Sequence, residues 1–86
     1  MSEVLPRVRK IIADRFFLED EFDNNSDIMK DFGADSLDMV ELVMIFEEQF
    51  KIRVNDDLSS QIKTVKQAAD TVEMLLAKKE EEQYED

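Results

Sequence analysis

Residues 33–50 have the sequence GADSLDMVELVMIFEEQF, which predicts an α-helix from about Ser36 to Phe50. Asp35 is a good N-cap for this helix, because its carboxylate can accept a hydrogen bond from a backbone N–H of the first turn. Asp38 adds negative charge near the positive end of the helix dipole. The apolar residues recur at spacings of three and four, so we expect the helix to bury one face in a core.

Projected at about 100° per residue, this helix is apolar on two sides rather than one. The side predicted to face the core consists of Met39, Leu42, Val43, Phe46 and Phe50. The opposite side carries Leu37, Val40 and Met44 among Glu41, Glu47 and Glu48, with Asp38 toward one edge. This pattern favours a partner with an apolar centre and a basic rim, since rim charges steer encounter and buried apolar contacts hold the complex. The alternative is a solvated acidic face with a few surface hydrophobes.

The rest of the chain also predicts helices. A first helix is expected from about Glu3 to about Phe17, where apolar residues follow one helical face. Residues 18–34 predict a long ordered loop held by four apolar anchors, Phe22, Ile28, Met29 and Phe32. A short helix is expected from about Asp56 to Gln61. The last helix is predicted to begin at Thr64, where Gln67 completes a capping box.

These elements predict an all-α fold, a four-helix bundle with three main helices, one short third helix and a long first loop. One glycine, one proline and no alternating β-branched segment argue against a sheet. We expect a single domain over residues 1–77. Beyond Ala77 the chain is almost entirely charged, so residues 78–86 are expected to form a disordered tail.

The composition excludes several classes of function. The 86 residues include 22 acids and 11 Lys or Arg, and the net charge of −11 disfavours nucleic acids and acidic lipids as partners. The chain has no Cys and no His, so we expect no metal site and no catalytic activity of its own. The longest apolar run, Leu42 to Phe46, is too short to span a membrane. The first residues do not resemble a signal peptide, which favours a cytoplasmic protein.

Ser36 is the candidate functional residue, because it occupies the first helical position while Asp35 supplies the cap. A hydroxyl at this position lies near unpaired backbone N–H groups and the positive end of the dipole, which favour a phosphate attached to it. The alternative is a helix-start serine with no further role.

Residues 31–42, DFGADSLDMVEL, resemble the phosphopantetheine attachment signature of acyl carrier proteins, whose core is Asp-Ser-Leu. The resemblance covers most of the chain, because it continues through Val43, Met44, Glu47, Glu48 and Phe50 to Ile62, Thr64 and Val65. It is closest to the carriers of bacterial and plastid fatty acid synthesis.

The resemblance implies that Ser36 carries 4′-phosphopantetheine, which a Mg²⁺-dependent phosphopantetheinyl transferase takes from coenzyme A. Asp35, Leu37 and Asp38 would adjoin the attachment site. The arm would deliver acyl intermediates as thioesters to fatty acid synthesis enzymes and acyltransferases with basic docking patches. The implied docking face consists of Leu37, Val40, Glu41, Met44, Glu47 and Glu48. The implied acyl pocket is lined by Met39, Leu42, Val43, Phe46, Ile62, Ala68 and Val72, each of which also fits as plain core. The carrier is expected to be a monomer.

Three other interpretations fit parts of the sequence. A specialised acyl, polyketide or aminoacyl carrier would share the same motif. A carrier fold that acts as an interaction protein without the prosthetic group is also compatible with the sequence. A calcium loop is suggested by the alternation of Asp23, Asn25 and Asp27, but Ile28 replaces the required Gly and Ala34 the bidentate Glu, which excludes an EF-hand.

Overall fold

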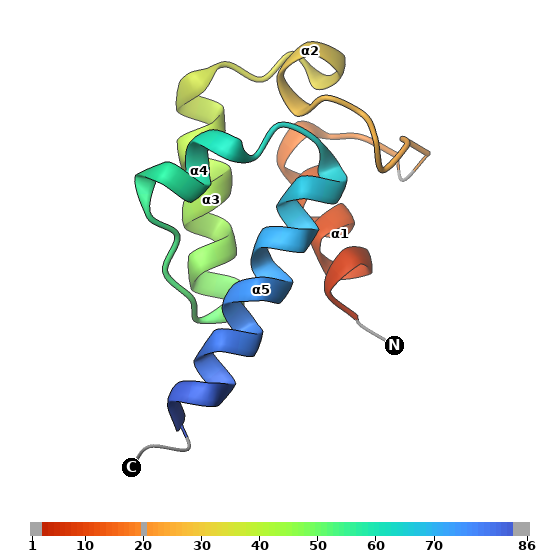
Figure 1. Ribbon diagram of the computed structural model, residues 1–86. Helices are drawn as coiled ribbons and strands as arrows, with labels where there is room; N and C mark the ends of the chain where they lie inside the picture. Colours follow the sequence, from red (N-terminus) through yellow and green to blue (C-terminus); the bar gives the residue numbers. More distant parts are fainter. Residues whose placement is uncertain (1–2, 20, 84–86) are drawn as a thin grey trace.

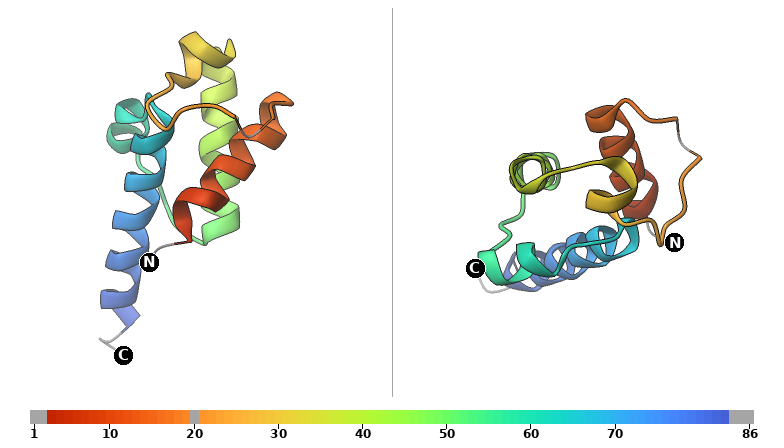
Figure 2. Two further views of the ribbon diagram at one scale, coloured as in Figure 1. Left: turned by 90° about the vertical axis from the view of Figure 1, so that its right-hand side faces the viewer. Right: turned by 90° about the horizontal axis from the view of Figure 1, so that it is seen from above.

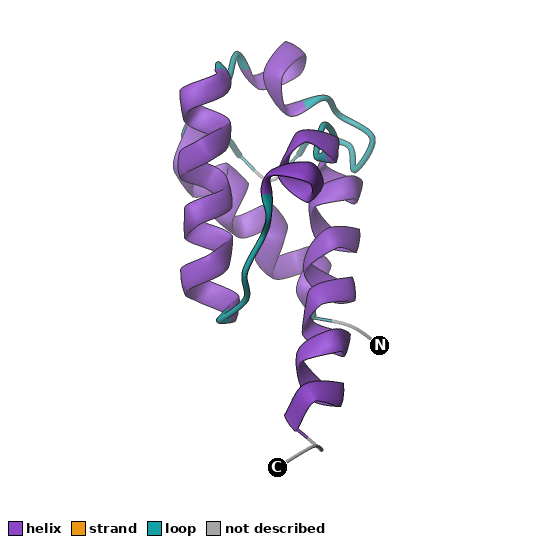
Figure 3. Ribbon diagram, turned by 60° about the vertical axis from the view of Figure 1, so that its left-hand side comes forward, coloured by secondary structure: helices purple, strands orange, loops and turns teal. Residues whose placement is uncertain are grey.

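The computed structural model describes residues 3–19 and 21–83, and for residues 80–83 it describes the backbone alone. These residues form five helices, α1 (Val4–Phe16), α2 (Ile28–Phe32), α3 (Ser36–Phe50), α4 (Asp56–Gln61) and α5 (Val65–Gln83). Over the described ranges the chain contains no strand (Figure 3), and its one isolated β-bridge joins Asp27 to Thr64. The all-α prediction is confirmed, and α3 and α4 have the bounds expected from the sequence.

Three long helices, α1, α3 and α5, form the body of the molecule (Figure 1). Helices α3 and α5 start at the same end and run in the same direction, while α1 runs the opposite way. Helix α2 covers the end at which α3 and α5 begin, and α4 lies near the start of α5 (Figures 1 and 2). The start of α3 therefore lies at one end of the bundle, beside α2.

A single core joins the helices. Each long helix supplies residues three or four positions apart, so that one face is buried. The most deeply buried are Val8 and Ile12 of α1, Leu42 and Phe46 of α3, and Val65, Ala68 and Val72 of α5. The predicted core face of α3 is confirmed, although Met39 is only partly buried. Burial of a large aliphatic or aromatic side chain contributes about 1.5–3 kcal/mol, before the cost of ordering it.

Local capping explains where α3 and α5 begin. The Asp38 N–H donates to the Asp35 carboxylate, and the Asp35 N–H donates to the Asp38 carboxylate, which completes a capping box. At α5, the Gln67 N–H donates to the Thr64 hydroxyl over 3.1 Å, and the Thr64 N–H donates to the Gln67 side chain over 3.0 Å. Both predicted caps are confirmed, and each satisfies N–H groups that the first turn leaves unpaired.

The first loop differs from its prediction, because residues 28–32 form a helix, α2. Asp27 caps this helix by accepting a hydrogen bond from the Lys30 N–H over 2.9 Å. Of the expected anchors, Ile28 is fully buried and Phe22 stacks edge-on against Phe32, with ring centroids 5.1 Å apart. Met29 was wrongly expected to be an anchor, since 45% of it is exposed. Its position in α2 turns it away from the core side occupied by Ile28.

Backbone hydrogen bonds tie the first loop to the start of α5. The Ile28 N–H donates to the Lys63 carbonyl over 2.8 Å, and the Val65 N–H donates to the Ser26 carbonyl over 3.2 Å. The Lys66 N–H reaches the Asn24 carbonyl over 2.8 Å. We call this set of three bonds the loop clasp. It explains how a loop without long helices of its own is held in one position over the bundle.

The end of α5 also differs from expectation. The helix was expected to give way to a tail after Ala77, but its backbone remains helical to Gln83. The reason is intrinsic propensity, since Lys, Glu and Gln are good helix formers and no Gly or Pro interrupts residues 65–83. The remainder of the expected tail, residues 84–86, lies outside the described residues.

Candidate functional site

Ser36 is the first residue of α3, and its side chain is exposed. The helix is already capped by the reciprocal bonds between Asp35 and Asp38, which measure 2.9 and 3.1 Å. Accordingly, the Ser36 hydroxyl makes no hydrogen bond with any described residue. The hydroxyl is therefore available at the surface, because the capping role that a serine often fills here belongs to Asp35.

The backbone around Ser36 suits a negatively charged group. Among the described residues, the N–H groups of Ser36 and Leu37 have no acceptor. At the start of α5, by contrast, the N–H groups of Val65 and Lys66 donate to carbonyls of the first loop. Open N–H groups and the positive end of the dipole attract anions such as phosphate. Of these two helix starts, that of α3 combines open amides with an exposed hydroxyl.

A tight turn delivers the chain to Ser36. Gly33 ends α2 with a φ of 73°, in the left-handed region that disfavours side chains. A Cβ at this position would meet nothing within 4 Å, so the need for glycine comes from the backbone alone. Ala34, the next residue, is buried in the core. The turn is thus anchored on one side, which places Ser36 at the surface in a defined position.

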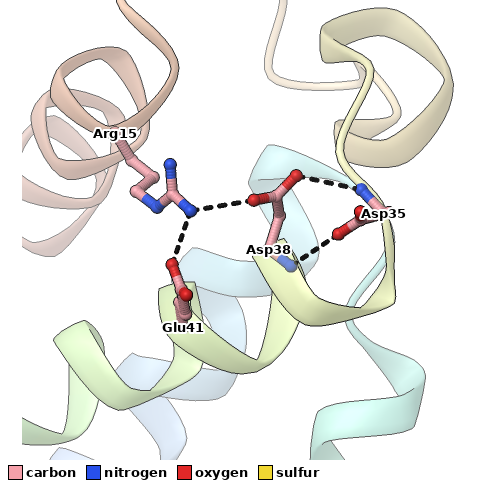
Figure 4. Close-up of polar contacts among 4 residues, drawn as sticks. All are labelled: Arg15, Asp35, Asp38 and Glu41. Atoms are coloured by element: carbon pink, nitrogen blue, oxygen red, sulfur yellow. Dashed lines mark hydrogen bonds and ion pairs between the residues drawn. The ribbon is translucent and has the colours of Figure 1, made fainter.

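An arginine from α1 reaches this site (Figure 4). The Arg15 Nη2 lies 2.8 Å from Asp38 Oδ1 and 2.6 Å from Glu41 Oε2, so one nitrogen holds two carboxylates of α3. This contact is not evident from the sequence, because residues 31–50 contain no Lys or Arg and Arg15 lies far away in the chain. The available signal was the spacing of Arg15, three and four residues after Ile12 and Ile11, which puts it at the edge of the core face.

The expected docking face is largely exposed. Its apolar members Leu37, Val40 and Met44 are each more than half exposed. Glu41 and Glu48 are exposed as well, but Glu41 is paired with Arg15. Glu47 is half-buried, and its carboxylate accepts a hydrogen bond of 2.9 Å from the Val54 N–H. The structure thus gives Glu47 a role in holding the loop after α3, in addition to the docking role expected for it.

The expected acyl-pocket residues are brought together in the core, where they pack against one another. They are the buried Leu42, Val43, Phe46, Ile62, Ala68 and Val72, with Met39 packed against them. An open groove of about 1370 Å³ lies elsewhere, between the second half of α3, the segment 51–55, α4 and α5. None of the seven expected residues lines that groove. Because these side chains are buried against one another, an acyl chain among them requires the core to repack.

The acids of the first loop serve local structure. Asp23 accepts a hydrogen bond of 3.1 Å from the Asn25 N–H, and Asp27 caps α2. Within the part of the chain that the structure describes, no group of three or more His, Cys, Asp or Glu side chains is arranged to hold a metal ion. Its helices also include none that is long and apolar enough to cross a membrane.

The fold and the site together define a class of protein, a small helical carrier that presents one serine at the start of an acidic helix. The family model described as the phosphopantetheine attachment site matches residues 6–72 of the chain. Over 78 residues the chain is 43% identical to an acyl carrier protein of Trieres chinensis, a match that covers 90% of this chain and 98% of that protein. It is 45% identical over 74 residues to acyl carrier protein 2 of Pseudomonas aeruginosa, covering 85% and 94% of the two chains.

Two solved structures share this fold. The crystal structure of an acyl carrier protein from Thermotoga maritima superposes with a TM-score of 0.75 at 28% identity, over 88% of this chain and 89% of that one. The solution structure of the acetyl actinorhodin acyl carrier protein from Streptomyces coelicolor shares the fold, with a TM-score of 0.67 at 20% identity over 86% and 91%. The chain belongs to the acyl carrier protein family, whose members are carriers of phosphopantetheine rather than catalysts.

Proposed function

We propose that Ser36 carries 4′-phosphopantetheine and that the chain delivers acyl groups to the enzymes of fatty acid biosynthesis. The observation that carries this proposal is the exposed, unbonded Ser36 hydroxyl at the first position of α3. The residues present fit the group, because the open N–H groups of Ser36 and Leu37 can receive its phosphate. When bound, the group supplies the thiol for a thioester, which a chain without cysteine lacks.

The residues beside Ser36 have distinct roles in this proposal. The reciprocal bonds of Asp35 and Asp38 hold the first turn of α3 rigid, so that Ser36 is presented in one geometry. By likeness to the family, these two acids also adjoin the phosphopantetheinyl transferase and its metal ion. Leu37 is exposed next to the attachment point and gives the transferase an apolar contact.

The docking face indicates which surface chemistry a partner needs. Leu37, Val40 and Met44 offer exposed apolar contacts, while Glu41, Glu47 and Glu48 offer negative charge. A partner that fits this face has apolar side chains ringed by Lys and Arg, as we expect for fatty acid synthesis enzymes and acyltransferases. We propose that the carrier itself is a monomer without enzymatic activity. Its net charge of −11 opposes self-association, and its lack of cysteine suits a reducing cytoplasm.

The proposed acyl pocket lies in the core between α3 and α5. Its residues would have to separate to admit a chain, and unbranched Met39 at the edge of the core is the side chain best able to adapt. Small residues opposite, Ala68 among them, leave the least volume to displace. Binding of an acyl chain would therefore replace contacts among the core side chains with contacts between those side chains and the acyl chain.

Intact-mass measurement tests the proposal directly. The chain is incubated with coenzyme A, Mg²⁺ and a phosphopantetheinyl transferase, and the expected result is a gain of one phosphopantetheine. Ser36→Ala should show no gain. Ser60→Ala, which removes an exposed serine of α4, is the matched control and should be modified like the parent chain. Modification of Ser36→Ala would overturn the assignment of the site, and full biological activity of an unmodified Ser36→Ala chain would favour a role as an interaction protein.

A further inference from the structure

We infer that Arg15 is a specificity-determining residue for docking, because it pairs with Asp38 and Glu41 in the first two turns of α3 and competes there with the basic residues of a partner. The inference rests on the proposed function, in which partners with Lys and Arg dock on α3. It adds a residue of α1 to a surface otherwise formed by α3.

The distances from Arg15 to Asp38 and Glu41 are those of salt bridges. Nη2 of Arg15 reaches Asp38 Oδ1 and Glu41 Oε2 over 2.8 and 2.6 Å, which is the range of charge-assisted hydrogen bonds (Figure 4). The side chains of Arg15 and Asp38 are 28% and 29% exposed, so both are partly withdrawn from water. Glu41 is more open, with 48% of its side chain exposed. Arg15 thus offsets one of the two negative charges that Asp38 and Glu41 place on the first two turns of α3.

The other acids of α3 are not equally engaged. Glu47 bonds the Val54 N–H and belongs partly to the loop after α3. The side chain of Glu48 is exposed and has no hydrogen bond or ion pair with the described residues. A partner cation can therefore reach Glu48 without breaking an existing ion pair, whereas at Asp38 and Glu41 it meets Arg15.

This distribution separates two kinds of partner. A partner whose basic residues contact only Asp38 and Glu41 must displace Arg15, so its new ion pairs replace existing ones and the net gain is small. Its cations are also repelled by the guanidinium until displacement occurs. A partner whose basic residues extend toward Glu48 gains charge contacts without that exchange. Arg15 thereby favours partners with the longer basic patch.

Transferase kinetics on the 86-residue chain without its prosthetic group test this role. Arg15→Gln removes the guanidinium and frees Asp38 and Glu41 for the enzyme. We expect the KM for the carrier to fall about two- to fivefold at low salt, the range typical of exposed ion pairs, with kcat unchanged. The difference should disappear at high salt, because screening weakens both kinds of contact. A purely structural role of Arg15 would predict no such salt-dependent fall in KM.

A matched control is available on the same helix. Lys10→Gln changes the net charge by the same amount, but Lys10 pairs with Asp14 in a highly exposed contact of 3.4 Å on α1 itself. The transferase KM for the Lys10→Gln variant should equal that for the parent chain. Equal KM values for Arg15→Gln and Lys10→Gln would overturn the inference, as would a higher KM for Arg15→Gln.

Two further variants keep the test decisive. Arg15→Gln introduced into Glu41→Gln should lower KM by less than it does in the parent chain, because one of the competing carboxylates is gone. If Arg15→Gln fails to fold, Arg15→Lys keeps the positive charge but holds the two carboxylates less tightly. This variant should still lower the KM for the carrier, and an unchanged KM would count against the role of Arg15. Absence of modification in every variant would instead reject the proposed function, whereas equal modification kinetics in all would reject the role of Arg15 alone.

Discussion

Ile28→Ala provides a quantitative test of how the first loop is held. Ile28 is fully buried although it lies in a helix of one turn, and alanine removes every carbon beyond its Cβ. Three buried carbon groups at about 0.8 kcal/mol each give about 2.4 kcal/mol. The cavity left behind adds to this, so we expect the free energy of unfolding to fall by about 3–4 kcal/mol. For a domain of this size the Tm should fall by more than about 12 °C.

The adjacent residue supplies the control. Met29→Ala alters the same short helix at a position that is 45% exposed, and we expect a loss of about 1 kcal/mol or less. Urea unfolding followed by far-UV circular dichroism measures both variants. Ile28→Val, expected to cost about 0.5–1.5 kcal/mol, extends the series if the alanine variant is too unstable. Losses of equal size at the two positions, or a loss below about 1 kcal/mol for Ile28→Ala, would refute the argument that this residue anchors the loop.

Three other outcomes are expected. Gly33→Ala should lower stability by about 1–2 kcal/mol in thermal melts, since its φ of 73° strains a side chain, and Gly33→Asn should lower it less; equal losses would argue against a backbone origin. Thr64→Ala should cost about 1 kcal/mol through loss of the α5 cap, while Thr64→Ser should retain most of it. The Tm should rise with MgCl₂, CaCl₂ or NaCl, because added cations screen a chain of net charge −11, and a Tm that does not change with ionic strength would contradict this.

Helices bounded by local signals were predictable. The start of α3 depends on Asp35 and the start of α5 on Thr64 and Gln67, and both signals act within four residues of the helix they begin. The two faces of α3 followed from its period in the same way. Exposure of Ser36 could be anticipated because the residue before it provides the cap.

Features that depend on distant residues were not predictable. Helix α2 is too short to be stable by itself and persists because Ile28 is buried and bonded to the segment before α5. The bond from Val54 N–H to Glu47 depends on how the chain turns after α3. The pairing of Arg15 with α3 depends on how α1 and α3 pack. In each case the partners become neighbours only after the bundle has formed, so neither period nor capping pattern indicates them.

The loop clasp has a consequence for the order of folding. Its bonds join segments that are far apart in the chain, so they can close only once the long helices have met. Slow hydrogen exchange at the amides of Val65 and Lys66 would then report the complete native state, whereas amides within α3 can be protected earlier by local structure. The same bonds make the loop and the first turn of α5 a single cooperative unit. Local unfolding of the loop therefore also exposes the first amides of α5, and unfolding of that turn releases the loop.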